Sequence, residues 1–132
     1  MNLAKLDKAF SEFIRLRDSN ENGYGNCISC GKVLHWKVAH CGHYISRRKY
    51  AVRYNEKNCN LQCVSCNTFQ EGNPAGYTLG LVRKYGKDVI NELYVASKLP
   101  TKWTQFEINE LTKYYKQKVK ELNEAKNQDN RL

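Results

Sequence analysis

The spacing of apolar residues predicts helices near both ends of the chain. Hydrophobic side chains recur at helical spacing over residues 3–18, with charged residues between them. Helical periodicity returns over residues 77–98, with an interruption at Gly86, and again over residues 104–123. The pattern therefore predicts an N-terminal helix, a broken helical segment and a C-terminal helix.

The middle of the chain, residues 27–75, follows a different pattern of short β-like runs between cysteines and turn residues. A length of 132 residues suits one domain. We therefore expect a single α+β domain over residues 1–132, in which flanking helices cover a cysteine-rich core. The last helix should begin with a capping box at Thr104 and Glu107, and the polar end from Asn123 onward should fray.

The charge adds a first indication of function. The chain has 22 Lys and Arg against 13 Asp and Glu, a formal net charge of +9. A small domain this basic attracts polyanions, which favours nucleic acid as a partner. The apolar runs are too short to span a membrane, and no signal peptide is recognisable. We therefore expect a cytoplasmic protein, in which disulfides are disfavoured.

Two C-x-x-C pairs predict a structural zinc site. They are Cys27 with Cys30, and Cys63 with Cys66. Two residues between thiolates allow both sulfurs to reach one tetrahedral ion, so two such pairs complete a four-sulfur Zn²⁺ site. The long segment between the pairs is an insertion that structural zinc does not explain.

Three further residues in the insertion belong to neither knuckle. Cys41 and Cys59 fit buried small hydrophobes, alternative zinc ligands or a close pair, and we favour the buried interpretation. His35 matches no motif, and we interpret it as structural.

The remaining polar residues of the insertion carry a family resemblance. His43 lies in Gly-His-Tyr-Ile-Ser-Arg, Asn58 stands five residues before Cys63, and Asn67 directly follows Cys66. This order resembles the HNH nuclease motif, a ββα-metal element. Over residues 10–98, the ordered motifs resemble the phage NinG (Rap) recombination family.

The resemblance implies an endonuclease that cuts branched recombination intermediates such as Holliday junctions. By motif position, His43 is the general base, Asn58 orients the loop that carries His43, and Asn67 ligates a catalytic divalent ion. HNH sites usually have an Asp or His directly before the base, where this chain has Gly42. His40 shares a strand face with residue 42 and is our candidate for the missing ligand. Mg²⁺, Mn²⁺ or a softer divalent ion would suit this site.

A basic cluster follows His43 and predicts phosphate contacts. Its members are Arg47, Arg48, Lys49, Arg53 and Lys57. The competing hypotheses are a zinc module that only binds DNA or RNA, and a zinc-stabilised adaptor for other proteins. Because branched DNA has two-fold symmetry, paired cuts would favour a homodimer.

Overall fold

Helices enclose two small β-sheets in the computed structural model, which describes residues 2–130 and side chains through residue 126. A mixed α+β fold is thus confirmed. In chain order, the elements are α1 (Ala4–Arg17), β1 (Tyr24–Asn26), β2 (Val33–His35), the 3₁₀ turn η1 (Trp36–Val38), β3 (His40–His43), α2 (Tyr50–Arg53), β4 (Cys59–Gln62), the π-helical turn η2 (Ser65–Phe69), α3 (Pro74–Tyr85), α4 (Val89–Ser97) and α5 (Gln105–Asn130).

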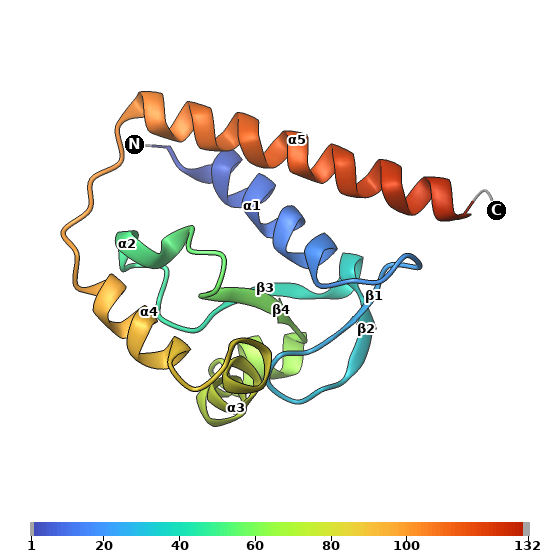
Figure 1. Ribbon diagram of the computed structural model, residues 1–132, viewed down its shortest axis with the longest axis horizontal. Coiled ribbons are helices and arrows are strands. Elements are labelled where there is room, and N and C mark those ends of the chain that lie inside the picture. The colour runs from blue at the N-terminus through green and yellow to red at the C-terminus, as the bar shows by residue number, and fades with distance from the viewer. Residues whose placement is uncertain (1, 131–132) are drawn as a thin grey trace.

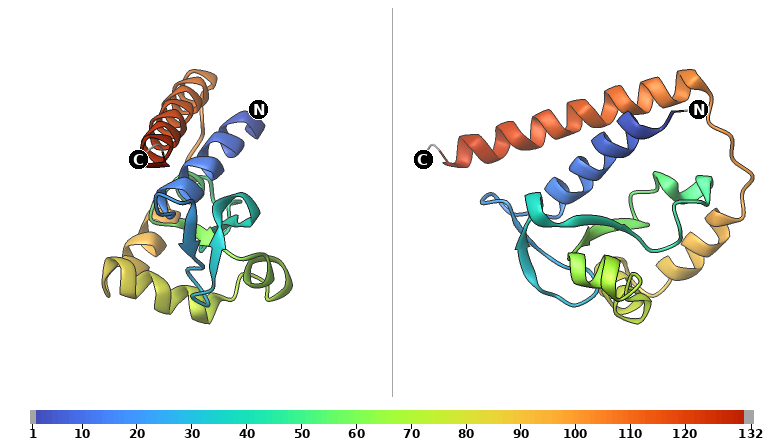
Figure 2. Two further views of the ribbon diagram at one scale, coloured as in Figure 1. Left: turned by 90° about the vertical axis from the view of Figure 1, so that its right-hand side faces the viewer. Right: turned by 180° about the vertical axis from the view of Figure 1, so that it is seen from behind.

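The two sheets are antiparallel strand pairs. Strand β1 pairs with β2, and β3 pairs with β4, with His40 opposite Gln62 and His43 opposite Cys59. The β3–β4 pair lies between α1 and α3 (Figures 1 and 2). Its Cys59 packs into the α1 cluster, while the hydroxyl of Tyr77 on α3 donates a hydrogen bond to the Gly42 carbonyl (2.7 Å). Both faces of the pair are therefore covered by helices.

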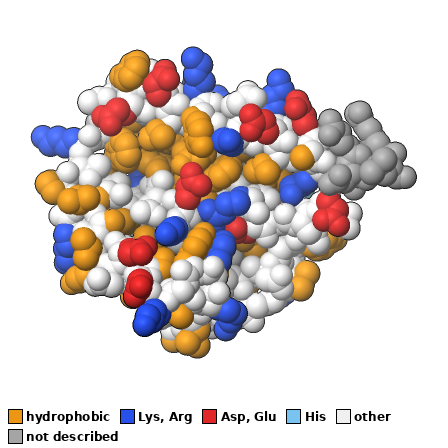
Figure 3. All heavy atoms as spheres, viewed as in Figure 1, with side chains coloured by type: hydrophobic (Ala, Val, Ile, Leu, Met, Phe, Trp, Pro, Cys, Tyr) orange, Lys and Arg blue, Asp and Glu red, His pale blue; other side chains and the backbone are white. Residues whose placement is uncertain are grey.

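Helix α1 buries its predicted apolar face beneath α5. Leu6, Phe10 and Ile14 are almost completely buried, and Phe10 meets the ring of Tyr115 from α5 edge to face at 4.9 Å. The two helices lie side by side along one edge of the molecule (Figure 2). On the face drawn in Figure 3, apolar side chains gather beneath α5, and acidic and basic side chains alternate around them. A second core cluster joins α3 to α4.

The helix boundaries match the sequence patterns with one correction. The capping box is present: Thr104 Oγ1 accepts from the Glu107 backbone N–H, and the Thr104 N–H donates to Glu107, both at 3.1 Å. The segment over residues 77–98 divides into α3 and α4 at Gly86, where φ is 95°. The expected fraying from Asn123 is wrong as far as Asn130, because α5 continues to that residue; residues 131–132 lie outside the described part of the chain.

The length of α5 has a tertiary cause. The Lys126 ammonium donates to the backbone carbonyls of Ser19 and Asn20, at 3.1 and 3.0 Å. These bonds attach the last turns of α5 to the loop after α1. A polar sequence that is marginal as an isolated helix is therefore held in place by a distant segment.

Within the described residues, no helix is long and apolar enough to cross a membrane.

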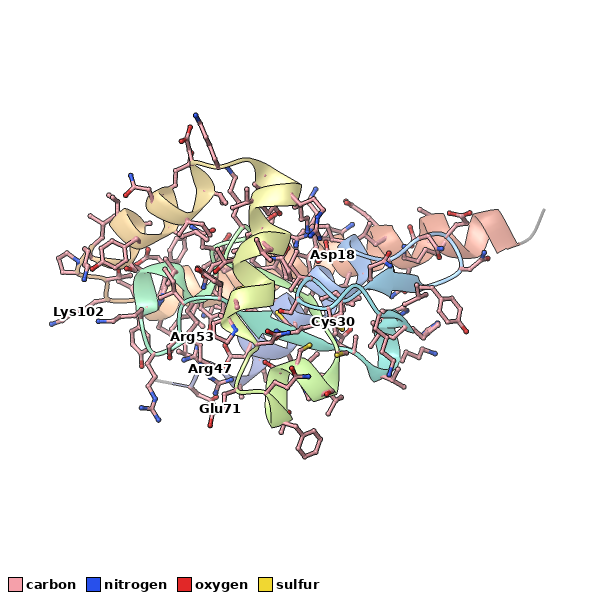
Figure 4. The ribbon with its side chains drawn as sticks, turned by 90° about the horizontal axis from the view of Figure 1, so that it is seen from below. Asp18, Cys30, Arg47, Arg53, Glu71 and Lys102 are labelled. Atoms are coloured by element: carbon pink, nitrogen blue, oxygen red, sulfur yellow. The ribbon has the colours of Figure 1, made fainter. Side chains whose placement is uncertain are left out.

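Asp18 joins the end of α1 to two other elements. Its carboxylate accepts hydrogen bonds from Arg17 Nε (2.9 Å), Lys84 Nζ on α3 (3.0 Å) and the Leu61 N–H on β4 (2.9 Å). Figure 4 shows Asp18 at the meeting point of these elements. Burial acts to raise the pKa of this carboxyl, but its cationic and N–H partners outweigh burial and hold the pKa below its ordinary value.

Replacing the Asp18 carboxylate tests this connection. We expect Asp18→Asn to lower the free energy of unfolding by about 2–3 kcal/mol at pH 7, since it leaves two partly buried cations without their partner. Because the folded-state pKa is depressed, this contribution is present above the unfolded-state pKa near 4 and lost as pH falls through the folded-state value.

Urea unfolding of wild type and variant from pH 7 to pH 3 measures the difference. The exposed Asp88 provides the control, because Asp88→Asn should change stability by no more than about 0.5 kcal/mol. A difference for Asp18→Asn that stays constant down to pH 3 would contradict the assigned pKa direction.

Candidate functional site

The four knuckle cysteines converge as a metal site would require. The Sγ atoms of Cys27, Cys30, Cys63 and Cys66 all lie within 4.8 Å of one another, and the Cys30 and Cys63 sulfurs are 3.8 Å apart. Four sulfurs bound tetrahedrally at about 2.3 Å from zinc are about 3.8 Å apart. The thiols are free rather than paired in disulfides. The spacing therefore fits the predicted zinc ligand set.

Hydrogen bonds support the two knuckles and join them. Gly31, with φ of 81°, closes the first turn by donating its N–H to the Cys27 carbonyl (2.9 Å). The Asn73 amide and the Cys66 backbone N–H each donate to a knuckle sulfur at 3.4 Å. Such donors favour the thiolate form that binds metal. The Gln62 amide connects the knuckles, because it donates to Ser29 Oγ (2.9 Å) and to the Gly72 carbonyl (2.7 Å).

His43 is held at the end of β3 with one ring nitrogen engaged. Its Nε2 lies 2.9 Å from the Arg53 carbonyl, which can only accept, so Nε2 carries the proton in this bond and Nδ1 remains an acceptor. Burial lowers the pKa of His43, and the charges of Arg47 and Arg53 lower it further, against the carbonyl bond and Asp7. The ring is therefore neutral near pH 7, as a general base must be.

Asn58 holds in place the loop that connects His43, at the end of β3, to the start of β4. Its side chain is fully buried; Oδ1 accepts from the Ile45 N–H (2.8 Å), and Nδ2 donates to the carbonyls of Ile45 (2.9 Å) and Val52 (3.1 Å). These three hydrogen bonds hold the path of the loop in place. Asn60, two positions later, instead bonds Lys84 (2.6 Å) and Tyr77 (3.3 Å), toward α3.

His40 and Asn67 are brought into direct contact. The Asn67 amide and His40 Nδ1 are 2.9 Å apart, although 27 positions separate them in the chain. With the amide rotated, its oxygen would lie beside the imidazole nitrogen. Adjacent ligands of an octahedral ion bound at about 2.1 Å are about 3.0 Å apart, so the pair fits two neighbouring positions around one divalent ion.

Gly42 directly precedes His43, at the position where the HNH resemblance implies a metal ligand, and it has no side chain. A Cβ at this position would collide with the side-chain amide of Gln62, which occupies that face of the strand pair. The absence of a side chain at position 42 therefore has a packing cause. The histidine that lies next to Asn67 is His40.

A cavity of about 360 Å³ opens beside these groups. His43, Asn67, Arg47 and Asp7 are among the residues that line it. The cavity thus brings the candidate base, one candidate ligand and a cation to a single opening, which suits a phosphate-bearing substrate.

The predicted basic cluster separates into exposed and engaged residues. Arg47, Arg48 and Lys49 are exposed after β3, and Lys57 is half-exposed within 3.5 Å of Glu92. Arg53 differs, because only 9% of it is exposed and its guanidinium bonds the Asp7 carboxylate at 2.6 and 3.0 Å. Arg47 and Arg53 lie near each other (Figure 4).

The Arg53 guanidinium is therefore committed to Asp7, and this structure argues against the expected phosphate contact. Local sequence could not indicate this ion pair, since the partner lies on α1 and is 46 positions away. The Asp7 carboxylate also accepts from the Tyr54 hydroxyl (2.7 Å). The backbone carbonyl of Arg53, by contrast, is the group that orients His43.

Two cysteines outside the knuckles lie close to His43. The sulfurs of Cys41 and Cys59 and a His43 ring nitrogen are all within 4.8 Å of one another. Cys59 is fully buried, as favoured from the sequence, while Cys41 is half-buried. The i, i+2 spacing of Cys41 and His43 is the only sequence sign of this cluster, because the approach of Cys59 depends on strand register.

His35 makes structural contacts. Its Nδ1 accepts from the Lys37 N–H (3.2 Å) and so caps the 3₁₀ turn, and its ring packs edge to face on Tyr24.

Comparison with known proteins gives one consistent family. A family model described as Bacteriophage Lambda NinG protein matches residues 3–126. Protein ninG of Escherichia phage lambda is 30% identical over 129 residues, which cover 96% of this chain and 59% of the relative. Protein ninG of Salmonella phage P22 is 30% identical, with 96% and 60% covered, and that of Escherichia phage 933W is 29% identical, with the same coverage.

The chain spans about three fifths of the length of these relatives. The family match also extends the resemblance from residue 98 to residue 126, and so includes most of α5. No solved structure matches the chain.

Substitution of Cys30 tests the knuckle site. Cys30 is exposed, and exposed substitutions usually change stability by about 0.5 kcal/mol or less. We nevertheless expect Cys30→Ser to lose zinc and to lower the midpoint of thermal unfolding by at least about 10 °C, because metal binding contributes to folding. Zinc content and thermal unfolding with and without a chelator measure both effects. Zinc-free wild type that unfolds at an unchanged temperature would contradict the prediction.

Proposed function

The chain belongs to the NinG family of bacteriophage proteins, and on that premise we propose that it is a metal-dependent DNA endonuclease of HNH type. The substrate we propose is branched DNA from recombination, such as a Holliday junction. The observation that carries the proposal is a neutral His43, oriented by the Arg53 carbonyl, beside a cavity lined by Asn67 and Arg47. The proposed place of action is the host cytoplasm.

The chemistry proposed for His43 is general base catalysis. Its Nδ1 takes a proton from a water molecule as the water oxygen bonds to phosphorus, and the bond from phosphorus to the 3′ oxygen breaks. The Arg53 carbonyl keeps the ring in one tautomer, and Asn58 holds the intervening loop so that this carbonyl stays in place.

His40 and Asn67 are the residues proposed to hold the catalytic ion. A divalent ion such as Mg²⁺ or Mn²⁺ supplies Lewis-acid stabilisation of the scissile phosphate and the leaving oxygen when it is bound. Because an imidazole and an amide are both neutral ligands, the phosphate itself would complete the charge balance. The ion would be distinct from the zinc proposed for the four cysteines.

Exposed cations support DNA as the substrate. Arg47 lines the cavity with His43, and Arg48 and Lys49, the next two residues in the chain, are exposed. The net charge of +9 would draw a polyanion toward the protein at long range. The two-fold symmetry of a junction favours action as a homodimer, which crosslinking or light scattering tests; a monomer mass on the junction would count against it.

Removal of His43 tests the proposed chemistry. We expect His43→Ala to cut a labelled four-way junction at least about 100-fold more slowly than wild type with Mg²⁺ or Mn²⁺, while it keeps the zinc of the four knuckle cysteines. His35→Ala is the matched control, since it removes a histidine with only structural contacts, and it should cut normally. Wild type should cut the junction faster than the matched linear duplex.

Two results would contradict these expectations. Equal cutting by His43→Ala would exclude His43 as the base. Tight binding without cutting under any divalent metal would instead favour the zinc module that only binds nucleic acid.

Arg47 should contribute to binding through a phosphate. We expect Arg47→Gln to weaken junction binding and to reduce the slope of log affinity against log salt by about 0.9, the value for one phosphate contact. Binding titrations at several salt concentrations measure this slope. Lys102, exposed before α5 (Figure 4), is the control, because Lys102→Gln should leave the slope unchanged. Equal slopes for Arg47→Gln and wild type would remove Arg47 from the interface.

A further inference from the structure

We propose that Cys41, His43 and Cys59 form a second metal site, selective for soft ions such as Zn²⁺, and that its occupation switches off His43. The binding site itself is independent of any catalytic role. Its inhibitory consequence rests on the proposed function.

Strand geometry brings the three ligands together. His43 lies opposite Cys59 in the β3–β4 pair, and Cys41 is two positions before His43, on the same face of the strand. Their two sulfurs and one ring nitrogen all lie within 4.8 Å of one another. None of these residues belongs to the knuckle site, so the two sites share no ligand.

The same geometry favours a bound ion over a disulfide. Cys41 and Cys59 are diagonal neighbours across the pair, because Cys41 is opposite Leu61. The Cα atoms of diagonal neighbours are about 7–8 Å apart, whereas the Cα atoms of a disulfide are usually about 4.4–6.8 Å apart. An ion that bonds each sulfur at about 2.3 Å bridges sulfurs about 3.8 Å apart and needs less displacement of the backbone.

The donor set determines which ion would bind. Two thiolates and an imidazole suit Zn²⁺, with a fourth position left for water, and they are poor ligands for Mg²⁺. Binding forms two metal–sulfur bonds and one metal–nitrogen bond and releases two thiol protons. The two thiolate charges balance the ion, so no net charge is left in a buried place.

The surroundings of His43 match those of a metal ligand. Its Nε2 is bonded to the Arg53 carbonyl (2.9 Å), and metal-binding histidines usually donate their second nitrogen in this way. Cys41 and His43 both line the cavity of about 360 Å³, which gives an ion a path from solvent. Cys59 lies behind them, and its Sγ is 3.7 Å from the same Arg53 carbonyl.

Occupation of this site would remove the base. While Nε2 donates its proton to the Arg53 carbonyl, Nδ1 holds the free electron pair of the ring. An ion bound with that hydrogen bond intact would therefore take the pair that accepts the proton of water. His40 and Asn67 carry no sulfur, so Mg²⁺ or Mn²⁺ would still bind there. The protein would then be active with hard ions and inhibited by a second equivalent of zinc.

Counting bound zinc tests the site without any activity measurement. Titration of the full chain against a competing chromophoric chelator should give two zinc ions for wild type and one for Cys41→Ser, with the second ion bound at least about 100-fold more weakly in the variant. Cys59→Val, which fills the buried volume, should also bind one. A single zinc in wild type, or equal second-site affinity in the variants, would overturn the proposal.

The rate of junction cutting then tests inhibition by zinc. For each protein, the rate with added zinc is compared with its own rate without zinc, at a fixed Mg²⁺ concentration. Wild type should slow at least about 100-fold when the second equivalent binds, and Cys41→Ser should not. A second bound zinc with undiminished cutting would overturn the switch and keep the site. If wild type cuts nothing even without added zinc, the nuclease proposal fails, while the zinc count still decides the site.

Discussion

The convergence of the four knuckle cysteines is the constraint on which the rest of the structure depends. The chain leaves the first knuckle, forms β2 and β3, and returns through β4 to the second knuckle. The Ile28 N–H donates to the Leu61 carbonyl (2.9 Å), so the first knuckle is also tied to β4 by the backbone. A metal that holds both knuckles would close this long loop and hold β3 against β4, and thereby set the position of His43.

The apolar core is divided into separate clusters. Closure of the long loop by a metal at the knuckles is therefore more important for stability. One apolar cluster lies between α1, α5 and the β3–β4 pair, and a second joins α3 to α4. The knuckle cysteines form a third cluster. In a small chain with a divided core, each apolar cluster contributes little to the free energy of unfolding. A metal ion bound by both knuckles would therefore contribute a larger share of the stability than it would in a larger domain.

Buried polar side chains determine the geometry of the candidate site more than apolar packing does. Strand β4 is buried on both faces and includes Asn60 and Gln62, and Asn58 directly precedes it. Their amides bond backbone or side-chain partners in neighbouring elements. Of the amide atoms of these three side chains, Gln62 Oε1 alone lacks a partner among the described residues. Bonds of this kind fix one strand register and one loop path, because a shifted register would leave them unpaired.

The sequence by itself determined the α1 face, the capping box at Thr104, the break at Gly86 and the pairing of the two knuckles. These features depend on local spacing, which a single sequence displays directly. The tertiary structure decided that Arg53 bonds Asp7, that His40 meets Asn67, that Cys59 approaches His43 and that α5 continues past Asn123. Each of these features depends on residues that are far apart in the chain. Strand register and helix packing bring those residues together, and local sequence patterns do not contain that information.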